Sequence, residues 1–269
     1  MNANDEHRPA LASTPAEVYD RLFVPALFEQ WGRIVAEAAA LAPRQRVLDV
    51  ACGTRVHARA APERGGRDGA VVGLDPNDDM LAVARRKSSF IEWKNGRGES
   101  LPFGEESFDA VVSQFGLMFF EDRPTALREM MRVLGPGGRL AVAVCDALDH
   151  SPGYAVLAEL LHRLFGEQVA EAFRAPFALG DPTQLLSICS QAGIRGAKVE
   201  RRDGMVRFVS IKSLISTERA CVWTLGGLLD DAQFERLLEA AEESLRPFAK
   251  ADGTVAFVMP ALIITHQKP

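Results

Sequence analysis

The sequence predicts an α/β fold in which a mostly parallel sheet is covered by helices on both faces. Short apolar segments alternate with segments of helical periodicity between residues 46 and 144, and this alternation is typical of βαβ units. Two of the apolar segments end in an aspartate that precedes a turn, at Asp49 and Asp75. The chain has 269 residues, of which 47% are hydrophobic and 25% charged. This length and composition suit one globular domain.

The N-terminal part is expected to hold a tail, a helical region and the first strands. Residues 1–14 are polar and are predicted to form a flexible tail. Residues 15–40 place apolar side chains at helical spacing, and Pro25 is expected to split them into two helices. Strands are predicted at 46–50, 70–74 and 90–94, and helices at 54–61 and 78–87.

The next segments complete the predicted sheet core. An apolar strand is expected at 108–114 and a helix at 124–133, followed by a strand at 139–144. The sequence Gly135-Pro136-Gly137-Gly138 should end the helix. Because parallel strands end at one edge of such a sheet, a ligand is expected there.

The alternation changes after residue 144. Helices are predicted at 154–173, 181–192, 211–223 and 231–249, with strands at 198–208 and 254–266. We expect a single domain over residues 15–269 with a ligand-binding core at 40–146. The helical insertions at about 150–176 and 210–250 are expected to form a lid over the substrate.

Four motifs carry the chemistry. They are Val47-Leu48-Asp49-Val50-Ala51-Cys52-Gly53-Thr54-Arg55, Val71-Val72-Gly73-Leu74-Asp75, Gly98-Glu99-Ser100-Leu101-Pro102-Phe103 with Ser107-Phe108-Asp109, and Arg132-Val133-Leu134-Gly135-Pro136-Gly137-Gly138. A glycine after the first strand lets the backbone approach a ligand. Asp75 follows Asp49 by 26 positions, close to the roughly 20 that separate a phosphate-side turn from an acidic ribose ligand.

In this order the motifs resemble class I S-adenosylmethionine-dependent methyltransferases, and they are most similar to the group that includes the ubiquinone/menaquinone-biosynthesis methyltransferases. The resemblance runs from about Tyr19 to Val144. It implies a Rossmann-like fold with a mostly parallel seven-stranded sheet and S-adenosylmethionine as cofactor. It also implies in-line SN2 methyl transfer to a small apolar or aromatic molecule, in which positioning supplies most of the catalysis.

The resemblance assigns a cofactor-binding role to residues at the ends of the strands. It implies that Asp49 orients the methionine ammonium group and that Asp75 holds the ribose hydroxyls. Residues flanking the nucleoside, bordering the adenine or closing the pocket complete the set, which is Tyr19, Ala51, Gly53, Asn77, Met80, Gly98, Glu99, Gln114 and Phe115. Phe115, Met118, Phe119 and Phe120 favour an apolar acceptor, such as a quinone, a lipid or a natural-product scaffold.

Two positions depart from the family pattern and define an alternative. Arg55 stands where the family usually has a glycine, and Arg97 stands where it usually has an acidic residue. An arginine cannot accept a hydrogen bond from the adenine amino group. The alternative function is therefore a non-catalytic protein of the same fold with impaired cofactor binding. A nicotinamide-dependent oxidoreductase is disfavoured because the first loop lacks a GxGxxG spacing.

A general base is not evident from the sequence. His150 and Asp146 are the best candidates because they follow the last core strand, and histidine transfers protons near neutral pH. His57 and His162 are weaker candidates. Asp146, like His150, could equally serve a structural role.

Composition limits the partners. The formal net charge of -5 gives no general attraction to nucleic acid. The absence of a long apolar run and of a secretory leader predicts a cytoplasmic protein with no stable membrane insertion. Cys52, Cys145, Cys189 and Cys221 show no metal-binding spacing and are expected to be free thiols. The expected partner is a small-molecule substrate, and a homodimer is one of the oligomeric states left open.

Overall fold

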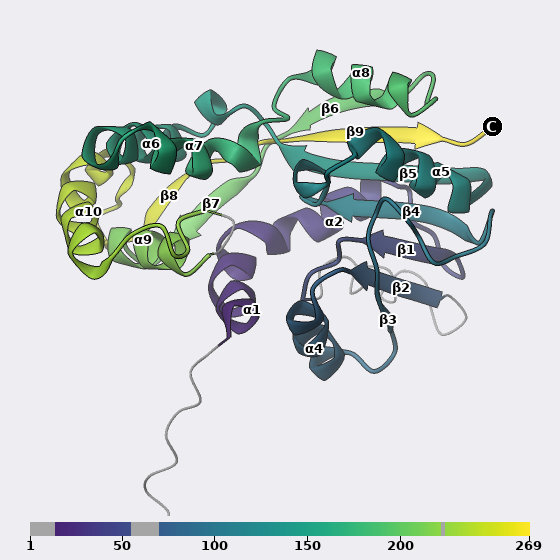
Figure 1. Cartoon of the computed structure of the whole chain (residues 1–269), viewed down its shortest axis with the longest axis horizontal. Coiled ribbons are helices and arrows are strands. Elements are labelled where there is room, and N and C mark those ends of the chain that lie inside the picture. Colours follow the sequence, from purple (N-terminus) through teal and green to yellow (C-terminus); the bar gives the residue numbers. More distant parts are fainter. Residues whose placement is uncertain (1–13, 55–69, 222–223) are drawn as a thin grey trace, which may run out of the picture.

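The computed structural model describes residues 14–54, 70–221 and 224–269 and confirms the predicted α/β fold. Its main sheet has seven strands in the order β3-β2-β1-β4-β5-β9-β6 (Figure 1). All neighbouring pairs are parallel except those made by β9, which runs antiparallel to β5 and β6. The strands of this sheet are β1 (Arg46–Val50), β2 (Ala70–Asp75), β3 (Glu92–Asn95), β4 (Phe108–Gln114), β5 (Leu134–Cys145), β6 (Lys198–Arg202) and β9 (Ala261–Gln267).

The helices largely begin and end where their capping residues predict. Asn77 caps α4 by accepting hydrogen bonds from the backbone N–H groups of Asp79 and Met80. Asp181 caps α8, which has Pro182 in its first turn. The helices are α1 (Pro15–Val18), α2 (Glu29–Ala38), α4 (Asp78–Lys87), α5 (Arg123–Val133), α6 (Pro152–Phe165), α7 (Glu167–Arg174), α8 (Pro182–Gln191), α9 (Ile211–Ala220) and α10 (Asp231–Ser244).

Each face of the sheet contributes to its own apolar core. Along β1, Val47 packs with Val35 of α2 on one face, whereas Leu48 and Val50 pack on the other with residues such as Met130 of α5. This alternation is the period-two pattern of a strand that is buried on both sides. The helices therefore cover both faces, as the sequence predicts.

Two predictions about the continuity of helices were wrong. Pro25 does not split residues 15–40 into separate helices, because Tyr19–Phe28 forms a π-helix, η1, that continues α1 into α2. The wider π-helical turn accommodates a residue without a backbone N–H. The segment predicted as one helix over residues 154–173 is in turn divided into α6 and α7 at Gly166, whose φ is 85°.

The two long strands predicted near the C-terminus are each divided between two sheets. β6 is followed by β7 (Met205–Phe208), and β8 (Val255–Val258) precedes β9. β7 and β8 pair with each other as a separate two-stranded sheet. Pro260 separates β8 from β9, and a proline interrupts a strand because it has no N–H to donate.

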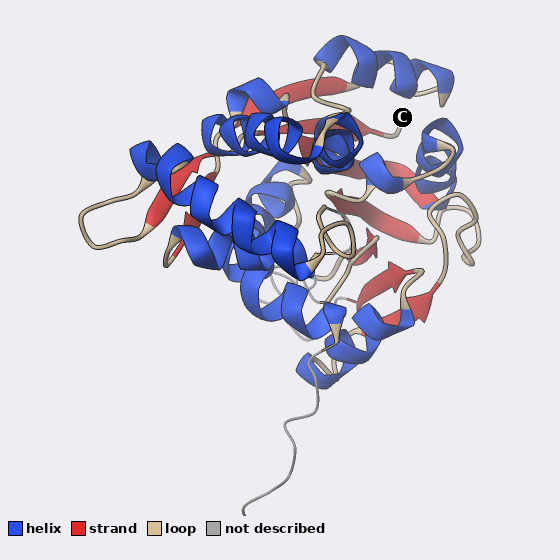
Figure 2. Cartoon of the chain, turned by 60° about the vertical axis from the view of Figure 1, so that its left-hand side comes forward, coloured by secondary structure: helices blue, strands red, loops and turns tan. Residues whose placement is uncertain are grey.

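The second sheet and four helices form a layer at the carboxyl ends of the parallel strands. We call α6, α7, α9, α10, β7 and β8 the helical cap; in Figure 1 they gather on the left of the molecule. Figure 2 brings this side forward and shows its helices in front of the main sheet. Within the described residues, no helix is long and apolar enough to cross a membrane. Residues 55–61, predicted as a helix, and the tail up to residue 13 lie outside the described residues.

Candidate functional site

A cavity of about 720 Å³ lies between the carboxyl ends of the strands and the helical cap. Its volume falls within the roughly 300–1,000 Å³ of pockets that hold cofactors and small ligands. Loops after β1, β2, β3 and β4 form one end, and the cap forms the other. Ten of the eleven residues that the sequence predicts to bind the cofactor line it, namely Tyr19, Ala51, Gly53, Asp75, Asn77, Met80, Gly98, Glu99, Gln114 and Phe115.

Asp75 joins the first two loops of this site. Its Oδ2 accepts a hydrogen bond of 2.9 Å from the Gly53 N–H, and its Oδ1 accepts one of 2.9 Å from the Asn77 N–H. Burial raises the pKa of the Asp75 carboxyl above its ordinary value, and the two backbone hydrogen bonds oppose that rise. Each carboxylate oxygen keeps a second lone pair, so Asp75 can accept further hydrogen bonds from a ligand in the cavity that it lines.

The loop after β1 turns through left-handed backbone conformations. Gly53 has a φ of 58°, which glycine adopts without strain, but Ala51 has a φ of 59°. An L-residue with a side chain is destabilised in this region by roughly 1–2 kcal/mol. The backbone is therefore held in a strained turn where it lines the cavity.

We expect Ala51→Gly to stabilise the protein by about 0.5 kcal/mol, because relief of the left-handed strain exceeds the greater freedom of glycine in the unfolded chain. Urea denaturation measures the change. Ala40→Gly is the matched control, since Ala40 also has a positive φ (47°) but is exposed away from the cavity. Both variants should gain stability. A loss of S-adenosylhomocysteine affinity in Ala51→Gly alone would show instead that the Ala51 methyl group contacts the ligand.

The loop after β3 forms the rim. Glu99 accepts a hydrogen bond of 3.0 Å from the Glu121 N–H, and Gly98 lies beside it on the cavity wall. Arg97 also lines the rim, but its guanidinium makes an ion pair of 2.9 Å with Glu121 and a longer one of 3.7 Å with Glu99. Its charge is thus balanced at the solvent edge, where 57% of its side chain is exposed.

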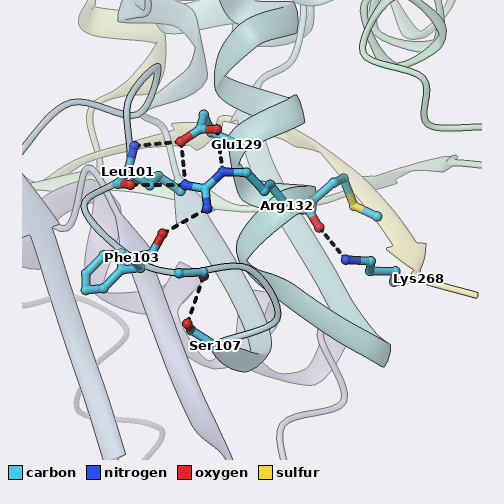
Figure 3. Close-up of polar contacts among 8 residues, drawn as sticks. Leu101, Phe103, Ser107, Glu129, Arg132 and Lys268 are labelled. Carbon is cyan, nitrogen blue, oxygen red and sulfur yellow. Dashed lines mark hydrogen bonds and ion pairs between the residues drawn. The ribbon is translucent and has the colours of Figure 1, made fainter.

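Arg132 of α5 fastens this rim loop to the core. Its guanidinium donates to the carbonyl oxygens of Leu101 and Phe103 at 3.1 and 2.8 Å, and it forms a two-pronged pair with Glu129 (Figure 3). Glu129 in turn accepts the Leu101 N–H at 2.9 Å. The arginine of the fourth motif therefore positions the loop that carries Gly98 and Glu99.

Replacing Arg132 by methionine should lower the free energy of unfolding by about 2 kcal/mol, because charge-assisted hydrogen bonds to the loop are lost. Lysine at this position should lose most of the same energy, since it cannot make the forked contact. Thermal unfolding tests both. Arg128→Met on the same helix is the control, because exposed Arg128 donates to the Gln191 carbonyl and the Thr125 hydroxyl rather than to the rim loop. An equal loss in Arg128→Met would contradict the special role of Arg132.

Aromatic rings from η1 and the β4 end form the middle of the cavity. Tyr19 and Phe28 have centroids 5.6 Å apart, and Phe28 lies 5.3 Å from Phe115. Burial raises the pKa of the Tyr19 phenol well above its ordinary value, and both Asp75 and Cys221 contribute to the rise. Tyr19 therefore stands where the loop end and the cap end of the cavity meet.

The cap contributes a second group of polar residues within aromatic surroundings. Tyr154 of α6 packs edge-on against Phe173 and Phe257, at 5.7 and 5.0 Å between centroids. Glu218 of α9 lies beside Tyr154 and is 1% exposed. Burial raises the pKa of the Glu218 carboxyl to about 7, although Thr224 and Tyr154 act in the opposite direction. A carboxyl that titrates near neutrality in a pocket is typical of groups that handle protons.

The structure places the remaining candidates away from this cavity. Asp49 is fully buried in β1 and does not line the cavity. Burial raises the pKa of the Cys52 thiol, and the nearby Asp49 adds to that rise. Asp146 accepts the Ala147 N–H and contacts both His150 and Arg201, at 2.9 and 3.1 Å. His150 and Asp146 thus form a polar cluster outside the cavity wall. His162 pairs with Glu167 on the surface, whereas His57 and Arg55 lie outside the described residues.

Sequence reasoning missed Glu218, although a signal was present. Apolar residues of α9 recur at Ile211, Leu214, Ile215 and Cys221, which defines a buried stripe. Glu218 occupies a position of that same stripe. A charged residue on the apolar face of an amphipathic helix marks either an internal ion pair or a functional group. All four cysteines are buried free thiols, as predicted, and the described residues contain no cluster of three or more potential metal-binding side chains.

Comparison with known proteins gives consistent matches. Residues 48–142 match a family described as a methyltransferase domain. The chain is 40% identical over 134 residues to the demethylmenaquinone methyltransferase of Renibacterium salmoninarum, which covers 50% of this chain and 55% of that protein. It is 31% identical over 205 residues to the demethylmenaquinone methyltransferase of Staphylococcus carnosus, with coverage of 70% and 85%. The match to the Renibacterium protein thus spans little more than half of that protein's length.

A solved structure is similar in fold. It is that of phosphoethanolamine N-methyltransferase 2 from Haemonchus contortus with phosphomonomethylethanolamine and S-adenosylhomocysteine, at a TM-score of 0.60 and 18% identity. The similarity covers 97% of this chain and 59% of the other. At this identity the likeness concerns the arrangement of the sheet and its helices.

Proposed function

This chain belongs to the class I S-adenosylmethionine-dependent methyltransferases, in the group that includes the ubiquinone/menaquinone-biosynthesis enzymes, and from that membership we propose that it methylates a small aromatic, quinone-type molecule. The observation that carries this proposal is that one cavity is lined both by motif residues at the ends of β1, β2, β3 and β4 and by aromatic residues of the cap. A cofactor and an apolar acceptor would share this enclosure.

The residues at the loop end fit S-adenosylmethionine. Asp75 would accept the ribose hydroxyls through the lone pairs that its two backbone hydrogen bonds leave free. The backbones of Ala51 and Gly53 would lie against the methionine part, where their left-handed turn keeps side chains from intervening. Met80 and Gly98 would border the adenine. Asp49, which is buried beneath this loop, would support the loop rather than contact the cofactor from the cavity wall.

The cap end suits an aromatic acceptor. Phe173 of α7 lines it, and Phe177 just after α7 and Phe115 and Met118 after β4 extend this apolar lining toward the middle of the cavity. S-adenosylmethionine supplies an activated methyl group on a sulfonium when it is bound. The protein then needs to hold the acceptor in line with that methyl group and to keep water out, and positioning of this kind can lower a barrier by roughly 7–11 kcal/mol.

Calorimetric titration of S-adenosylhomocysteine tests the cofactor part of the proposal, and micromolar affinity is the expected result. Transfer of a labelled methyl group to 1,4-dihydroxynaphthalene tests the acceptor part. No binding of S-adenosylhomocysteine would overturn the proposal and favour the non-catalytic alternative. Binding without transfer to any aromatic acceptor would preserve the cofactor site and refute the acceptor class.

Arg97, one of the two residues that motivate the alternative, does not close the site. Its guanidinium pairs with Glu121 and Glu99 at the rim, and the cavity inside that rim remains open. The positive charge is therefore directed to neighbouring carboxylates. This arrangement removes a steric obstacle to cofactor binding, while the missing acidic acceptor at position 97 continues to motivate the alternative.

A further inference from the structure

We propose that Glu218 is the proton acceptor of this site, and that the methyl acceptor is an aromatic molecule whose hydroxyl proton passes to the Glu218 carboxylate. This inference rests on the proposed methyltransferase function and names a property of the acceptor. The geometry of the cap end carries it.

Glu218 meets the first requirement of a proton acceptor, which is a hydrogen-bonding group beside the ligand space. Its side chain lines the cavity and is buried. Within the described parts of the chain, buried Glu218 Oε2 makes no hydrogen bond of good geometry, although the neighbouring Tyr154 hydroxyl lies near enough to interact with the carboxylate. Buried polar atoms are almost always satisfied, so a carboxyl and a phenol that meet with poor hydrogen-bond geometry on the lining of a cavity point to a ligand group that completes their hydrogen bonding.

The surroundings of Glu218 meet the second requirement, which is a pKa close to the pH of the solution. Its carboxyl has a pKa of about 7 because burial disfavours the charged form. Near neutral pH a substantial fraction is therefore ionised and able to accept a proton, which is the range in which general bases are most effective. An ordinary exposed glutamate would be ionised but a much weaker base.

The other titratable groups near Glu218 do not supply a competing charge. Tyr154 lies beside it, and Cys145 and Cys221 lie near Tyr154 in turn. Burial raises the pKa of Tyr154 and of Cys145, so both remain neutral. The elements packed on α9 are α1, η1, α10 and β7. Their charged groups are engaged elsewhere or exposed: Glu17 with Arg86, Asp20 with Lys87, Asp231 with Arg219, and Arg207 at the surface of β7.

Proton transfer to Glu218 accompanies methyl transfer. The acceptor O–H bond breaks, its electron pair stays on the acceptor, and the proton joins the Glu218 carboxylate. An electron pair of the ionised acceptor forms the new bond to the methyl carbon, and the carbon–sulfur pair returns to sulfur, which leaves a neutral thioether. The proton then passes from Glu218 to water. This completes oxygen methylation. In ring-carbon attack the methylated carbon still bears its hydrogen, so that C–H bond must also break, its electron pair returns to the ring, its proton leaves to water and the ring oxygen regains a proton from water.

The test compares wild type with Glu218→Gln, which keeps the size of the side chain, and with Glu218→Asp, which keeps the carboxyl. Exposed Glu242→Gln on α10 is the matched control. For transfer to 1,4-dihydroxynaphthalene we expect Glu218→Gln to lower kcat about 100-fold and to lose the rise of kcat/KM with pH near 7. Glu218→Asp should retain that rise at a reduced rate, and Glu242→Gln should match wild type.

Binding measurements keep this inference separate from the proposed function. The affinity for S-adenosylhomocysteine should stay within twofold in Glu218→Gln, whereas failure of wild type to bind it would refute the proposed function instead. Infrared spectroscopy provides a readout without turnover. The Glu218 carboxyl band should titrate near pH 7 and shift on addition of 1-naphthol. Unchanged kcat and pH profile in Glu218→Gln, or a carboxyl band that 1-naphthol leaves unmoved, would overturn the role of Glu218.

Discussion

Asp75→Asn is expected to weaken S-adenosylhomocysteine binding about 100-fold, as measured by calorimetry. Hydrogen bonds to a charged partner contribute roughly 1.5–3 kcal/mol, and a factor of 100 corresponds to about 2.7 kcal/mol. The substitution does more than remove charge. Oδ1 and Oδ2 each accept a backbone N–H, from Asn77 and Gly53, whereas an amide offers one accepting oxygen and one donating nitrogen. One of the two loops must therefore lose its anchor.

The control for Asp75→Asn is Asp109→Asn at the opposite edge of the sheet. Asp109 also accepts a backbone N–H, from Arg46 at 2.7 Å, through a single oxygen. An asparagine can keep that bond by turning its amide oxygen inward, so this variant should bind S-adenosylhomocysteine like wild type. If Asp75→Asn retained wild-type affinity while remaining folded, the assignment of Asp75 to the ribose would be wrong.

The strands that build the site could be predicted because their signals are local. β1, β4 and α4 lie where the sequence places them, since each is a short apolar or capped segment next to a turn. The continuous helix through Pro25 and the division of the C-terminal strands could not be predicted. Both depend on tertiary packing: η1 contacts β7, and β7 pairs with β8 rather than continuing β6. A period-two pattern does not show to which sheet a strand belongs.

The loop end of the site was predictable from its motifs, and the cap end was not. Asp75 and Gly53 are placed together because parallel strands end on one edge. Tyr154 and Glu218 lie 64 positions apart on two cap helices, and only the fold brings them to one cavity wall. The histidine and aspartate after β5 were attractive by chain position, yet Asp146 is occupied by Arg201 of β6 and by His150. The position of His150 and Asp146 after β5 did not determine whether their side chains line the cavity.

Glu218→Gln should stabilise the protein at pH 8 while it impairs methyl transfer. The pKa of the Glu218 carboxyl is about 7 in the folded protein against an ordinary value of 4.5. The folded state therefore binds this proton more tightly than the unfolded chain, and the contribution of Glu218 to stability falls as pH rises from 4.5 through 7. At about 1.4 kcal/mol per pKa unit, the ionised carboxylate lowers the free energy of unfolding by about 3 kcal/mol at pH 8.

Urea denaturation of wild type and Glu218→Gln at pH 5 and pH 8 measures this effect. The two proteins should differ little at pH 5, and the variant should be more stable at pH 8, whereas Glu242→Gln should follow wild type at both. Equal pH dependence in wild type and Glu218→Gln would show that solvent reaches the carboxyl in solution. A variant that is more stable but less active would demonstrate a trade-off between stability and activity. The buried Glu218 carboxylate lowers the stability of the fold, and it contributes to function by accepting a proton from a bound ligand.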